Sequence, residues 1–86
     1  MNIKEVLIQL SNVGIEAELI DESEYRIFGG KPNKTELGFS FYSQPFSIFF
    51  DKENWILTTT GKGQLDNVEK FNTLDEAINK LYSYYA

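Results

Sequence analysis

Two helical patterns stand at the ends of this chain, and the segments between them alternate with the period of β-strands. The apolar residues near the N-terminus fall on one helical face: Ile3, Val6, Leu7 and Leu10. Asn2 followed by Glu5 is typical of a capping box. Gly14 suits the position after a helix end, because glycine accepts positive φ. These signals predict a helix over about residues 2–12.

A second helix is predicted at the C-terminal end. Thr73 can cap it, and Glu76 lies at the capping-box distance. Its apolar stripe consists of Leu74, Ala77, Ile78, Leu81, Tyr82 and Tyr85. Each helix is apolar on one side only, so each must pack against another element.

The middle of the chain predicts antiparallel strands. The expected strands cover residues 15–20, 24–28, 37–42, 46–50 and 55–59, and a weaker pattern lies at 67–71. Two glycines and a proline within residues 29–34 indicate a loop, and Gly61 to Gly63 indicates a turn. Pro45 favours an edge position or a turn, because proline cannot donate to a sheet ladder.

Register can be predicted for two hairpins. A three-residue loop at 21–23 would set Leu19 beside Tyr25, Ala17 beside Ile27 and Glu18 beside Arg26. The best hairpin pairs Phe50 with Trp55 across a polar turn. That register places five apolar side chains on one face: Phe46, Ile48, Phe50, Trp55 and Leu57.

Because every strand is amphipathic, one face of the sheet needs a cover, and the two helices are the available cover. The predicted fold is a single α+β domain over residues 1–86. It is a two-layer sandwich in which an N-terminal and a C-terminal helix pack on one face of an antiparallel sheet of about four or five strands. Eighty-six residues are enough for one core.

The chain contains neither histidine nor cysteine, so the commonest general base, the thiol nucleophile and the usual zinc ligands are missing. The glycine-lysine runs at 29–31 and 61–63 lack the spacing of a phosphate-binding loop. No catalytic constellation is recognisable. We therefore expect a protein that is not an enzyme and that has no cofactor and no metal site.

The formal net charge is −5. A chain of this charge is repelled by phosphate backbones, so we expect no direct binding of nucleic acid. It favours a basic protein partner, whose approach the charge would accelerate. The sequence has neither a signal-peptide core nor a membrane-spanning stretch, and these absences predict a cytoplasmic protein that does not bind membranes.

Acidic residues are densest in the first hairpin. Five of them lie within nine residues: Glu16, Glu18, Asp21, Glu22 and Glu24. One interpretation is an acidic docking face for a basic partner. The other is a solvated strand face and turn that protect a sheet edge.

The second candidate surface is apolar. The central hairpin places Phe49 opposite Ile56 on the face away from the helices, and Tyr42 is expected to join them from a neighbouring strand. An uncovered apolar patch of this kind marks a partner site or a dimer interface. The alternative is that a loop at 29–36 or 61–70 folds over the patch.

Together these features predict a small acidic interaction protein that binds another macromolecule. An inhibitor or an immunity-type protein, encoded by a phage or mobile element, is one concrete form of that hypothesis. The alternative is self-association into a homodimer through the same patch, with a small-molecule pocket. The partner-binding residues predicted on either surface are Phe49, Ile56, Tyr42, Glu16, Glu18, Asp21, Glu22 and Glu24.

Overall fold

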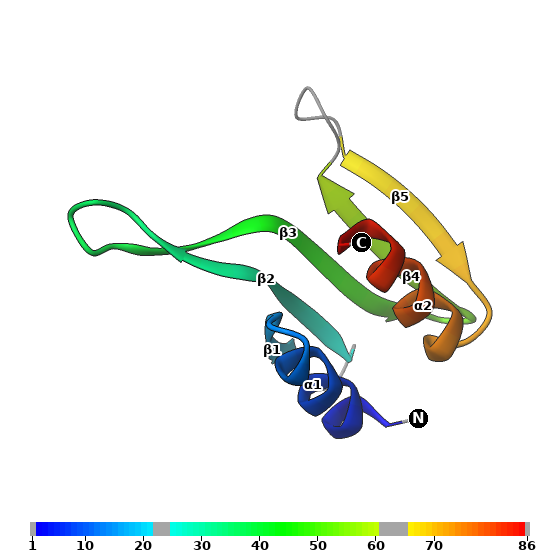
Figure 1. Cartoon of the computed structure of the whole chain (residues 1–86). Helices are drawn as coiled ribbons and strands as arrows, with labels where there is room; N and C mark the ends of the chain where they lie inside the picture. Colours follow the sequence, from blue (N-terminus) through cyan, green and yellow to red (C-terminus); the bar gives the residue numbers. More distant parts are fainter. Residues whose placement is uncertain (1, 22–24, 61–65, 86) are drawn as a thin grey trace.

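The structure is a computed structural model that describes residues 2–21, 25–60 and 66–85. It shows five antiparallel strands in the spatial order β1-β2-β3-β4-β5, preceded and followed by a helix (Figure 1). In chain order the elements are α1 (Ile3–Asn12), β1 (Glu16–Asp21), β2 (Arg26–Lys34), β3 (Ser40–Asp51), β4 (Asn54–Thr60), β5 (Asp66–Phe71) and α2 (Leu74–Tyr85).

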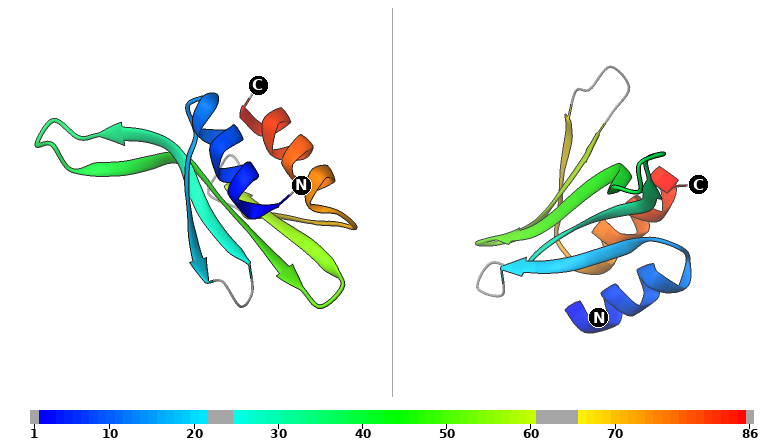
Figure 2. Two further views of the ribbon diagram at one scale, coloured as in Figure 1. Left: turned by 90° about the horizontal axis from the view of Figure 1, so that it is seen from below. Right: turned by 90° about the vertical axis from the view of Figure 1, so that its left-hand side faces the viewer.

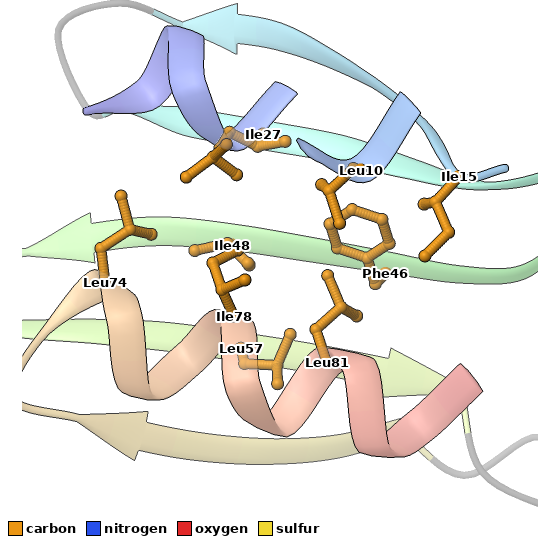
Figure 3. Close-up of a cluster of buried hydrophobic side chains, with 10 residues drawn as sticks. Leu10, Ile15, Ile27, Phe46, Ile48, Leu57, Leu74, Ile78 and Leu81 are labelled. Atoms are coloured by element: carbon orange, nitrogen blue, oxygen red, sulfur yellow. The ribbon is translucent and has the colours of Figure 1, made fainter. Parts of the chain in front are cut away.

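Both helices lie on the same side of the sheet, as Figure 2 shows. The core fills the space between the two layers, where side chains from both helices meet those of the central strands (Figure 3). Ile27, Ile48 and Leu57 project from three adjacent strands and are at most 1% exposed. The predicted two-layer α+β fold is therefore confirmed, including the common face of the helices.

The ends of the helices follow the capping signals. The Asn2 Oδ1 atom accepts a hydrogen bond from the Glu5 backbone N–H at 2.9 Å, and Thr73 Oγ1 accepts one from Glu76 at 3.2 Å. Gly14, with φ of 82°, stands just after the end of α1. These contacts satisfy backbone donors that a helix start leaves unpaired.

The central hairpin has the predicted register. Phe50 pairs with Trp55, and Phe49 pairs with Ile56 on the opposite face. The weak pattern near 67–71 also forms a strand, since β5 pairs with β4 along its length.

The predicted register of the first hairpin is wrong by two residues. Leu19 pairs with Ile27, Ala17 with Gly29 and Glu18 with Phe28, so Arg26 does not face Glu18. A Cβ atom at Gly29 would lie 2.7 Å from Ala17 Cα, a distance that no real side chain tolerates. Glycine is thus required where the two strands approach each other most closely. A shift of two keeps every side chain on its face, so the alternation could not detect it.

The predicted loop at 29–34 is also wrong, and so is a turn at Pro45, whereas the alternative of an edge position is right because, in the part of the chain that the structure describes, β4 pairs with β3 only as far as Phe46. β2 continues to Lys34, and β3 runs without interruption through Pro45. The pairing shifts where Gln44 and Pro45 together face Gly30, and Gln44 has a φ of 51° there. This β-bulge accommodates the proline within the strand. Beyond it, residues 31–44 project from the body of the molecule as a two-stranded arm (Figure 1).

Candidate functional site

The candidate site is the face of the sheet that points away from both helices, which we call the outer face. Two rows of side chains cross it. Glu18, Phe28, Ser47, Thr58 and Val68 form one row through successive strand pairs. Phe49, Ile56 and Lys70 belong to the second row. No helix or strand that the structure describes packs over these residues.

Phe49 occupies the centre of the second row. The guanidinium carbon of Arg26 lies 4.5 Å from the centre of its ring, which is a cation–π geometry. Phe49 remains partly exposed beside that contact. Ile56, opposite Phe49, is only 5% exposed. Ile56 therefore supports the ring of Phe49 and offers a partner almost no surface of its own, in contrast to the role expected from the sequence.

Tyr42 joins the outer face at the β1 side rather than beside Phe49. Its ring meets the Phe28 ring edge-on, with the centroids 5.7 Å apart. Tyr42 lines the same hollow as Glu16 and Glu18. Burial raises the pKa of Tyr42, and the negative charges of Glu18 and Glu16 raise it further by disfavouring a phenolate. The hydroxyl is thus held as a proton donor next to two carboxylates.

The acidic residues of the first hairpin are only partly brought together. Glu16 and Glu18 are exposed, point to the outer face and line one hollow with Tyr42 and Lys34. That hollow has a volume of about 690 Å³ and lies where the arm leaves the sheet. Asp21 ends β1 opposite Arg26. The remaining two predicted acids, Glu22 and Glu24, lie outside the described residues.

Three apolar residues of this face were missed by the sequence reasoning. Phe28 is 38% exposed, Ile20 59% and Val68 61%. Ile20 and Phe28 line a second hollow of about 330 Å³, together with Arg26, Ser47 and Thr58. The pairing of β2 with β3 would have revealed Phe28, because it places Phe28 in one row with Ser47 and Thr58.

The neighbouring segments do not cover this face. Residues 29–34 belong to a strand, and β5 extends the sheet sideways. Residues 61–65, the other part of the loops expected to cover the patch, lie outside the described residues. The outer face is therefore open in the part of the chain that the structure describes.

The chemistry of the described residues is limited. Among them, no three acidic side chains converge as a cation would require, and every buried side-chain nitrogen or oxygen has a hydrogen-bond partner. No helix in these ranges has the length and apolar character needed to cross a membrane. What the outer face provides is aromatic surface, the cationic side chains of Arg26 and Lys70, and the carboxylates of Glu16 and Glu18.

Comparison with protein-family models finds no match, and comparisons with curated proteins and with solved structures find none either. A functional interpretation therefore depends on the outer face itself.

Proposed function

We propose that this protein is a non-enzymatic binding domain whose outer face docks a basic protein partner. The observation that carries the proposal is an open sheet face with partly exposed Phe28, Tyr42, Phe49 and Val68. Apolar side chains clustered on an open face favour association, because docking removes them from water. Aromatic residues are also enriched at protein interfaces.

Charge favours a basic partner. Glu16 and Glu18 line the same face as Phe28 and Tyr42, and the whole chain carries a net charge of −5. Opposite charge steers partners together and suppresses wrong pairings. An inhibitor or immunity-type protein that covers a basic surface of its target is the concrete form that we favour.

The test begins with Phe49→Asp. Wild type and variant are immobilised and exposed to extract of the source organism, and the retained proteins are purified and titrated against both. We expect wild type to retain a basic protein and the variant to bind it at least ~100-fold more weakly, since a charge replaces an aromatic anchor. The matched control is Ile8→Asp, which adds the same charge to an exposed position on α1.

Fold retention is checked by circular dichroism. Because Phe49 is partly buried, Val68→Asp repeats the test at a 61% exposed position of the same face. The proposal fails if folded Phe49→Asp and Val68→Asp proteins bind the partner as wild type does, or if the retained partner is acidic. A wild-type dimer that Phe49→Asp splits would instead support the homodimer alternative.

A further inference from the structure

The arm at residues 31–44 has features that the proposed function does not use. It leaves the sheet as two strands, and three large apolar side chains near its tip are exposed: Leu37 by 85%, Phe39 by 68% and Phe41 by 48%. A two-stranded ribbon alone is marginally stable in water, and three or more strands are normally needed. The arm is therefore suited to accept further strands.

The hydrogen bonds of the arm show which backbone groups are available. The Thr35 N–H donates to the Phe39 carbonyl at 2.9 Å. In an antiparallel ladder bonded and non-bonded pairs alternate, so Asn33 and Phe41 form the next bonded pair. The backbone groups of Lys34 and Ser40, and of Pro32 and Tyr42, then point outward. Pro32 fits this assignment, because it has no N–H to donate to the ladder.

The two outer edges of the arm differ. On the β2 edge Pro32 presents no donor and Lys34 is charged, and both features discourage strand pairing. On the β3 edge residues 37–44 contain no charge and no proline. Among the described residues, β4 pairs with β3 only as far as Phe46, so Ser40 and Tyr42 face no strand there. Only the β3 edge is thus open to another strand.

We propose that the β3 edge of the arm pairs antiparallel with the same edge of a second copy of this chain. A two-fold axis at Phe41 places the two Phe41 side chains side by side. Ser40 then faces Tyr42 of the other copy, and each such pair exchanges two backbone hydrogen bonds. The two ribbons become one four-stranded sheet, which gives each arm the additional strands it lacks.

Charge makes the arm the place where a second copy meets the least repulsion. Residues 31–44 carry two lysines and one glutamate, which is a net charge of +1. Because the whole chain has a net charge of −5, the remaining residues carry −6. Two copies repel each other through their bodies. The arm projects from the body in Figure 1 and in the left view of Figure 2, so pairing at its edge keeps the acidic bodies apart. The contact is small, and we expect a dissociation constant of about 0.01–1 mM.

The test compares two proline substitutions by sedimentation over a concentration series. Ser40→Pro removes an outward N–H on the β3 edge, and Lys34→Pro removes one on the β2 edge. Neither N–H bonds within the ribbon, so both variants leave the ladder of the arm intact, and Lys34→Pro differs from Ser40→Pro in also removing one positive charge. We expect Ser40→Pro to weaken the dimer by about 10-fold or more, since both copies lose a bond, and Lys34→Pro to leave it unchanged.

Amide hydrogen exchange supplies a readout that does not depend on the variants. As wild-type concentration rises, the amides of Ser40 and Tyr42 should exchange more slowly. The Lys34 amide should not change, and the Phe41 amide should be protected throughout because it bonds within the ribbon. Phe49→Asp should dimerise as wild type does, which separates this inference from the proposed function.

Several results would overturn the inference. One is a wild-type protein that stays monomeric up to about 1 mM, where even the weakest expected dissociation constant would place about half of the chains in dimers. Another is equal weakening of the dimer by Ser40→Pro and Lys34→Pro. A monomer whose Ser40 and Tyr42 amides become protected only on addition of an extended peptide would replace the second copy with a different partner.

Discussion

At the scale of single residues, Gly29 determines the register of the first hairpin more strongly than any apolar side chain does. It faces Ala17, and a Cβ atom there would lie 2.7 Å from Ala17 Cα and closer still to the Glu16 carbonyl oxygen. The position therefore selects the register in which Phe28 and Glu18 share a row. One missing side chain thus determines which residues stand together on the outer face.

We expect Gly29→Ala to lower the free energy of unfolding by about 3 kcal/mol, because backbone atoms must move to admit the methyl group. Gly38→Ala is the matched control. Gly38 has open space around it and a φ of 88°, so the same methyl should cost only about 1 kcal/mol from backbone conformation. Urea denaturation of both variants checks the difference, and equal losses would contradict the close approach at Gly29.

At the scale of elements, the end of α2 is tied to the sheet by two tyrosines. Tyr84 OH donates to the Thr60 carbonyl at 2.8 Å, and Tyr85 OH donates to the Gln44 carbonyl at 2.6 Å. The second bond reaches the β-bulge at the base of the arm. Tyr84 lies off the apolar stripe of α2, yet it packs against the core. These two hydrogen bonds therefore attach the C-terminal helix to the sheet and to the base of the arm.

This tie predicts a pH dependence. Burial raises the pKa of Tyr85 above its ordinary value of 10.0, and the neighbouring Tyr84 adds to the shift. Below pH 10 both folded and unfolded chains keep the proton, so the stabilisation is fully present. Above pH 10 the unfolded chain loses the proton first, and stability falls as the pH rises. The raised pKa of Tyr42 acts in the same direction.

Tyr85→Phe removes this hydrogen bond and should lower the free energy of unfolding by about 1 kcal/mol at neutral pH. Its stability should then fall less steeply than that of wild type above pH 10, since the raised pKa of Tyr85 no longer contributes. Urea denaturation at a series of pH values measures both effects. Parallel curves for the two proteins above pH 10 would contradict the role assigned to Tyr85.

At the scale of the whole molecule, surface properties are divided among three regions. The helices close the core on one side, the outer face carries aromatic side chains and carboxylates, and the arm carries two lysines and exposed apolar groups. Two different contacts are consequently possible at once. A partner on the outer face and a second copy on the arm would share Tyr42, whose side chain lies on the outer face and whose backbone belongs to the β3 edge of the arm.

The charge of the molecule predicts the kinetics of partner binding. The double variant Glu16→Gln/Glu18→Gln should slow association with the basic partner by about 10-fold at low salt and flatten its salt dependence. Glu5→Gln/Glu76→Gln removes the same charge from the helical layer and should change the rate much less. Stopped-flow mixing at several salt concentrations measures both variants, and equal effects would show that only net charge matters.

The sequence by itself determined the two helices, the faces of the strands and the central hairpin. Helix stripes, capping residues and strand alternation depend on neighbours a few positions apart, and the polar turn between Phe50 and Trp55 leaves one register that keeps the apolar residues together. Phe49, Tyr42, Glu16 and Glu18 were consequently expected on the side where they lie.

Only the tertiary structure decided the remaining features. The register at Gly29 depends on backbone distance between strands, and the passage of β3 through Pro45 depends on a bulge that needs Gly30 opposite. The burial of Ile56, and the difference between the β2 and β3 edges of the arm, depend on the residues at which the neighbouring strands end. Such features arise from contacts between segments distant in the chain, and a pattern of period two or 3.6 carries no information about them.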